Sequence, residues 1–209
     1  MTAMESQKEH WEKVYQTKQP NEVSWTQEVP TTSLEFIHSL NLSKTTKIID
    51  VGGGDSKLVD YLLAEGFTDI TVLDISAHAI ERAKNRLGNQ SQKVKWIVSD
   101  IVDFEPTTDF DLWHDRATFH FLTKSEQVAK YVDIVRRCVK EYLVIGTFSK
   151  SGPKKCSGLD IQRYNEESLT EEFKNEFEKI RSMTEDHTTP FNTLQNFLFC
   201  SFKRRRQTE

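Results

Sequence analysis

Short apolar runs alternate with helix-like stretches from residue 47 to residue 148. Each run has the length of a buried strand, and the stretches between them carry apolar residues at steps of three and four. The clearest helix is expected between Lys124 and Lys140, where Val128, Tyr131 and Val135 share one face. Strands are expected at 47–51, 69–74, 93–100, 110–115 and 141–148. Strands that alternate with helices predict right-handed crossovers and a parallel sheet.

The last part of the chain departs from this alternation. After a helix expected at 166–173, residues 177–190 and 195–205 read as two long strands. Their connection is too short for a parallel crossover, so the two strands are expected to be antiparallel. The fold class is therefore α/β: a doubly wound, mostly parallel seven-stranded sheet with an antiparallel C-terminal strand pair and helices on both faces.

The first forty residues look like an addition to this sheet. Trp11, Val14 and Tyr15 fall at helical spacing, a loop lies between Pro20 and Pro30, and a short helix follows. We predict that residues 1–44 form an N-terminal helical cap or lid and that residues 45–209 form the main domain.

Composition narrows the possible partners. Of 209 residues, 36% are hydrophobic and 29% charged, with a net charge of −4, so no global positive field attracts nucleic acid. No apolar run reaches membrane-spanning length, and no nucleic-acid or membrane partner is predicted. The three cysteines form neither a disulfide framework nor a metal cluster, so we expect a cytoplasmic location and no metal site.

Three consecutive glycines, Gly52 to Gly54, follow the first strand. In a doubly wound sheet this turn lies where ligands bind, and glycine lets a ligand approach bare backbone. A dinucleotide fingerprint needs a third glycine at position 57, where Lys57 stands, and the ending of a phosphate-binding P-loop is absent. A turn needed only for tight packing is the simpler alternative.

Acidic residues at the ends of the first three strands indicate which ligand this turn could bind. Asp50 precedes the glycines, Asp74 ends the second strand, and Asp100 ends the third, beside Ile101. A carboxylate after the second strand can accept both hydroxyls of a ribose. Asp100 and the Ile101 backbone suit the edge of an adenine. Together these residues outline an adenosine with an anionic appendage.

Three polar residues, His114, Asp115 and Arg116, close the fourth strand. The carboxyl end of that strand faces the same crevice as the glycine turn, which favours ligand contact. A buried structural knot of salt bridges is the alternative.

The ordered motifs IIDVGGGDS, VLDIS, SDIVDF and FDLWHDRATFHFLT, with the terminal antiparallel pair, resemble class I S-adenosylmethionine-dependent methyltransferases. The resemblance covers about residues 45–205. The front segment, HWEKVY…VSW, is similar to a branch shared by small bacterial methyltransferases and some protein-lysine methyltransferases. Ser56 stands where the family usually has the last glycine of its loop, which leaves binding possible because the serine hydroxyl or amide can meet the cofactor's carboxylate.

The resemblance implies roles for individual residues. The methionine part of the cofactor would pass along the glycine backbone, Asp74 would hold the ribose, and Ile75 would pack on the adenine. His114, Asp115 and Arg116 are the candidates for catalysis near the methyl group. The implied cofactor-binding residues are Asp50, Gly52, Gly53, Gly54, Ser56, Asp74, Ile75, Asp100, Ile101 and His114, with Trp11, Tyr15 and Trp25 as an aromatic lid or, alternatively, a hydrophobic staple.

The resemblance therefore implies S-adenosylmethionine as cofactor and methyl transfer, by in-line displacement, to a small-molecule or protein-lysine acceptor. Two alternatives stay open. One is a module that binds the cofactor without turning it over. The other is an NAD-dependent oxidoreductase, which Lys57 and the antiparallel terminal pair disfavour.

Overall fold

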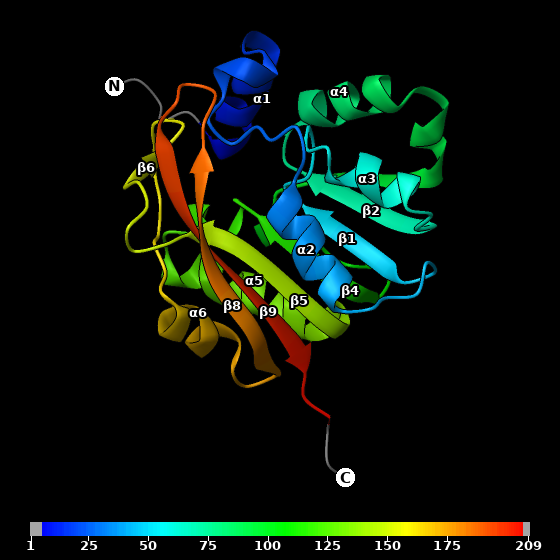
Figure 1. The fold of residues 1–209 in the computed structure, drawn as a ribbon, viewed down its shortest axis with the longest axis vertical. Helices are drawn as coiled ribbons and strands as arrows, with labels where there is room; N and C mark the ends of the chain where they lie inside the picture. The colour runs from blue at the N-terminus through cyan, green and yellow to red at the C-terminus, as the bar shows by residue number, and fades with distance from the viewer. Residues whose placement is uncertain (1–5, 207–209) are drawn as a thin grey trace.

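A seven-stranded sheet forms the centre of the molecule (Figure 1). The computed structural model describes residues 6–206. The strand order is β3-β2-β1-β4-β5-β9-β8, in which the strands up to β5 are parallel and β5-β9-β8 are antiparallel. The strands are β1 (Lys47–Val51), β2 (Asp69–Asp74), β3 (Val94–Val98), β4 (Phe110–Arg116), β5 (Val139–Phe148), β8 (Phe177–Thr188) and β9 (Leu194–Arg204). The predicted fold class is confirmed.

Helices cover both faces of this sheet, as its sequence of strands and helices predicts. They are α1 (Gln7–Thr17), α2 (Thr31–Ser39), α3 (Leu58–Ala64), α4 (Ala77–Leu87), α5 (Ser125–Cys138) and α6 (Glu166–Phe173). A small ribbon of β6 (Lys155–Cys156) and β7 (Leu159–Asp160) follows β5, and 3-10 turns lie at Pro20–Glu22, Gly88–Lys93, Ile101–Asp103 and Phe119–Phe121. No helix in residues 6–206 is both long and apolar enough to cross a bilayer.

Alternation along the strands divides the core into two layers. Ile48 and Leu112 face the layer that includes α2 and α3, and their neighbours Ile49 and Trp113 face the layer of α5 and α6. The same alternation decides where the polar residues at the end of β4 point.

The N-terminal segment divides into two parts in the structure. Phe36 and Ile37 of α2 are buried in the layer under the sheet, so this helix packs as part of the main body. Helix α1 lies instead beside the start of α4, beyond the carboxyl ends of the strands (Figure 1). Helix α2 thus extends the body across the boundary predicted at residue 44, and a lid role for α1 stays a prediction. Residues 1–5 lie outside the described part of the chain.

Candidate cofactor and acceptor site

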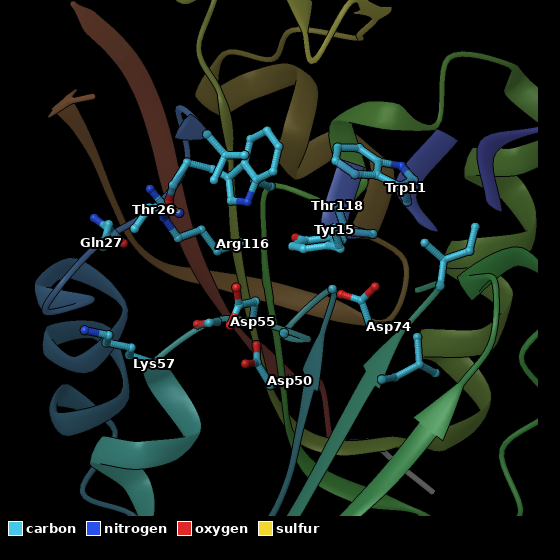
Figure 2. A pocket seen from close by; sticks show the side chains of 18 of the residues that line it. Trp11, Tyr15, Thr26, Gln27, Asp50, Asp55, Lys57, Asp74, Arg116 and Thr118 are labelled. Atoms are coloured by element: carbon cyan, nitrogen blue, oxygen red, sulfur yellow. Dashed lines mark hydrogen bonds between the residues drawn. The ribbon is translucent and has the colours of Figure 1, made fainter. Parts of the chain in front are cut away.

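A cavity of about 540 Å³ lies at the carboxyl ends of the parallel strands. It extends across the switch point between β1 and β4, where doubly wound sheets bind ligands. Asp50 and Asp74 reach it from the ends of β1 and β2, Asp55 reaches it from the loop after β1, and Trp11 and Tyr15 of α1 lie across from them (Figure 2). The cavity is of the size that small ligands and cofactors occupy, and it has one acidic side and one aromatic side.

The glycine turn forms the floor of this cavity. Gly52 has a φ of 69°, and a Cβ atom there would lie 1.8 Å from the Thr118 hydroxyl oxygen. At Gly53 a Cβ would lie 2.2 Å from the Asp50 carboxylate. Both Gly52 and Gly53 line the cavity. Only bare backbone fits here, which leaves room for a ligand to lie against it.

Asp50 belongs to a buried hydrogen-bonded chain. His114 Nδ1 lies 2.7 Å from Asp50 Oδ1, and His114 Nε2 lies 2.9 Å from the Ser33 hydroxyl of α2. The Asp50 Oδ2 atom is buried and has no hydrogen-bond partner among residues 6–206. Because Asp50 and His114 both line the cavity, this free carboxylate oxygen is suited to accept from a ligand's ammonium group or from a water bound to it. Both His114 ring nitrogens already have partners, which leaves His114 no free base for catalysis.

Asp74 lies at the end of β2 with both carboxylate oxygens held by backbone amides. Gly54 N–H donates to Oδ2 at 2.9 Å, and Ser76 N–H donates to Oδ1 at 2.8 Å. Burial raises the pKa of Asp74 to about 6, against these two hydrogen bonds, which lower it. A carboxylate fixed in this way accepts further from two vicinal hydroxyls once it is ionised.

The remaining sequence-predicted residues of the strand ends also reach the cavity. Ser56, Ile75, Asp100 and Ile101 line it. Asp100 Oδ1 accepts from Val102 N–H at 3.1 Å, which caps the turn at Ile101–Asp103 and fixes the carboxyl group. Gly54 does not line the cavity; its N–H supports Asp74 instead.

The structure corrects the expectation that Asp115 shares the crevice with His114 and Arg116. Adjacent strand residues point to opposite faces, so His114 and Arg116 face the cavity and Asp115 faces α5. Asp115 is fully buried, and its carboxylate accepts from the Tyr131 hydroxyl at 2.7 Å and from Thr118 N–H at 3.0 Å. Burial raises its pKa to about 6. This geometry assigns Asp115 to the core.

Trp11, Tyr15 and Trp25 form an aromatic cluster that lines the cavity. The Trp11 ring centroid lies 5.5 Å from that of Trp25 and 5.1 Å from that of Phe121. The cluster thus packs on the body, as a staple does, and also covers the cavity, as a lid does.

Sequence reasoning missed residues that complete the site from distant elements. Ser33, Thr118 and Glu12 are examples: the first two support the floor, and Glu12 holds α1 in place. Glu12 accepts from Ala77 N–H at 2.8 Å and from the Ser76 hydroxyl at 2.8 Å at the start of α4. The exposed amides of a helix start predict some acidic partner, but nothing in the sequence indicates which acid reaches them.

Residues 48–142 match a family model described as methyltransferase domain. This match covers a little under half of the chain. It confirms the resemblance to a methyltransferase, whereas the finer assignment from the HWEKVY…VSW segment stays a prediction.

A zebrafish (Danio rerio) EEF1A lysine methyltransferase 2 is 25% identical over 154 residues, which cover 72% of this chain and 62% of that protein. The match thus spans less than two thirds of the relative's length. Two solved structures share the fold. One comes from work on conversion of a disulfide into a thioacetal in echinomycin biosynthesis, with a TM-score of 0.78, 16% identity and coverage of 96% of this chain and 94% of that one.

The second is the Bradyrhizobium japonicum N-methyltransferase NodS in complex with S-adenosylhomocysteine. It has a TM-score of 0.66 and 16% identity, and the match covers 86% of this chain and 90% of that one. The residues that line the cavity fit S-adenosylmethionine, the cofactor that the sequence motifs imply. In the described part of the chain Asp50 Oδ2 accepts no hydrogen bond, the turn at Gly52 admits only bare backbone, and Asp74 offers an oriented carboxylate.

Proposed function

We propose that this methyltransferase transfers the methyl group of S-adenosylmethionine to a small-molecule acceptor. The observation that carries the proposal is the cavity, which combines an adenosine- and ammonium-binding acidic side with an aromatic, partly enclosed side. The acceptor fits between this aromatic side and the end of β4, where Arg116 is. A cavity covered by α1 suits a small acceptor better than a folded protein surface.

The chain's own residues hold and orient the reactants. Asp50 accepts from the ammonium group, Asp74 from the ribose hydroxyls, and Asp100 with Ile101 contacts the adenine edge. Bound S-adenosylmethionine would supply a methyl group on a sulfonium, whose sulfur would keep the electron pair of the broken carbon–sulfur bond as the acceptor's lone pair forms the new one. Alignment of the acceptor and exclusion of water by Trp11, Tyr15 and Trp25 are what the protein contributes.

Protein lysine is the second candidate acceptor, because the zebrafish relative carries that activity in its name. A lysine must enter deprotonated to attack the methyl group. The Arg116 cation at the cavity disfavours the protonated amine and so favours the neutral one. It also opposes entry of lysine in its common, charged form.

Transfer of a tritium-labelled methyl group separates these functions. The protein is incubated with the labelled cofactor and an extract of the source organism, which is then divided into macromolecules and metabolites. Label in the metabolite fraction supports the proposal, and label in protein would favour the lysine alternative. Tight binding of S-adenosylhomocysteine with no label in either fraction would indicate a binding module.

We expect the affinity for S-adenosylhomocysteine to fall as the pH is lowered from 8 to 5. The raised pKa of Asp74, about 6, means that its carboxylate becomes protonated in this range and can no longer accept from both ribose hydroxyls. Below the pKa the dissociation constant should rise by up to about tenfold per pH unit. Calorimetric titration with S-adenosylhomocysteine between pH 8 and pH 5 measures the dissociation constant. An Asp74→Asn variant should bind weakly with a flat profile; a flat wild-type profile would contradict the role of Asp74.

We expect Glu12→Gln to release the cofactor about 5- to 10-fold faster. Although burial opposes ionisation, hydrogen bonds from His78, Ala77 and Ser76 hold the pKa of Glu12 at about 2, so an anion caps α4. Loss of such a charge at a helix start weakens the contact by about 1 kcal/mol or more. Stopped-flow release of S-adenosylhomocysteine measures the effect. Exposed Glu81 on α4 is the control. Equal release rates in Glu12→Gln and Glu81→Gln would show that Glu12 does not hold α1 over the cavity.

A further inference from the structure

Arg116 brings a guanidinium with unused donors to the cavity. Its Nη1 donates to the backbone carbonyl of Trp25 at 3.0 Å. Its Nε and Nη2 atoms are buried and have no partner among the described residues. The guanidinium carbon lies 4.8 Å from the centroid of the Phe197 ring. A guanidinium offers a planar fork of N–H groups, and here two of its three nitrogens remain available.

The other cations that line the cavity have carboxylate partners. Within residues 6–206, Arg116 is the one cavity-lining Lys or Arg with no carboxylate oxygen within 4.0 Å. Glu185 influences its charge only from farther away. The pairs are Lys57 with Glu28, Arg82 with Asp55, and Arg86 with Asp55 and Asp60.

Aromatic rings pack around Arg116, although the charge of Glu185 also acts on it. The Phe197 ring packs on Phe148 at 4.5 Å between centroids, and His120 stacks on Phe148 at 4.5 Å. Burial lowers the pKa of Arg116 to about 10, which still leaves the side chain charged at neutral pH. A buried guanidinium with unpaired N–H donors destabilises the protein until an anion binds it. A carboxylate suits this site because its two oxygens can accept from two guanidinium N–H groups at once.

A second group without partners lies in the same region. His120 is fully buried, and neither ring nitrogen has a hydrogen-bond partner in the described chain. Burial and the nearby Arg116 charge lower its pKa to about 3, so the ring is neutral, with one donor and one acceptor nitrogen. His120 is not among the residues that line the cavity, so this neutral ring lies behind the Arg116 end of the site and makes no contact with a ligand there.

We propose that the Arg116 end of the cavity is the acceptor subsite and that Arg116 binds the carboxylate of a small acceptor with an aromatic or branched alkyl body. This rests on the proposed function. S-adenosylmethionine carries a net positive charge, so an unpaired cation in the same cavity opposes it. An acceptor carboxylate on Arg116 neutralises that cation. The aromatic rings around it contact the body of the acceptor.

Two matched pairs of probes test the subsite by calorimetry on the protein saturated with S-adenosylhomocysteine. The pairs are benzoate with benzamide and isovalerate with isovaleramide, which differ only in the anion. We expect the wild type to bind at least one carboxylate 10-fold or more tightly than its amide. Arg116→Met should abolish the difference, and Arg116→Lys should restore part of it. The control Arg137→Met, on the surface of α5, should behave as wild type.

Two results would overturn the proposal. One is a wild type that distinguishes neither carboxylate from its amide. The other is an Arg116→Met variant that binds S-adenosylhomocysteine 10-fold more weakly but 5′-methylthioadenosine, which lacks the carboxylate, with unchanged affinity. In that case Arg116 holds the cofactor's carboxylate. If the protein bound carboxylates more tightly than amides but transferred no methyl group, the proposed function would be wrong and the anion subsite would stand.

Discussion

Asp115→Ala is expected to lower the free energy of unfolding by about 3–5 kcal/mol with little effect on cofactor affinity in the folded protein. The Asp115 carboxylate accepts from Tyr131 Oη, Thr118 N–H and Phe119 N–H. Tyr131 Oη in turn accepts from Trp113 Nε1 at 2.8 Å. Removal of the carboxylate leaves three donors without their acceptor, and each buried loss costs about 1–3 kcal/mol.

Urea unfolding measures the first effect, and titration with S-adenosylhomocysteine measures the second. Asp133→Ala on the outer side of α5 is the control, because this half-exposed carboxylate pairs with Arg136 and Arg137 on the surface of the same helix. It should change stability by less than about 1 kcal/mol. If Asp115→Ala kept its stability but lost turnover about 100-fold, the original prediction of a catalytic carboxylate would stand and the structural role would not.

Much of the fold could be predicted because its signals are local. The helix at Glu166–Phe173 and the antiparallel pair β8-β9 follow from periodicity and from a short connection. The same local reasoning placed Asp50 and Asp74 at the cavity, since the carboxyl ends of parallel strands meet at one edge. Residues that act at strand ends were therefore accessible to sequence reasoning.

The error at the end of β4 concerns the direction of side chains, which alternation along the strand decides. His114, Asp115 and Arg116 were treated as one group, although alternation along β4 separates the middle residue from its neighbours. The partners of these residues come from other elements: Ser33 from α2 and Tyr131 from α5. Such pairings depend on tertiary packing, which no local pattern encodes.

Gly52→Ala is expected to weaken binding of S-adenosylhomocysteine by about 100-fold or more, equivalent to about 2.7 kcal/mol. Gly52 has a φ of 69°, and its new Cβ would lie 1.8 Å from the Thr118 hydroxyl oxygen. That oxygen lies 3.3 Å from the Val51 carbonyl, so Thr118 cannot move without disturbing the floor of the cavity. The backbone must shift instead, and a cradle that a cofactor follows closely loses its shape.

Gly66→Ala separates backbone strain from crowding. Gly66 has a φ of 89°, and no atom lies within 4 Å of its virtual Cβ. Both variants carry the cost of a left-handed alanine, about 1 kcal/mol or more, so both should unfold at lower urea. Only Gly52→Ala should lose S-adenosylhomocysteine, because only Gly52 lies on the cavity. If the two variants bound S-adenosylhomocysteine equally well, the glycine turn would be a packing device, and Asp50 and Asp74 would have to hold the cofactor without it.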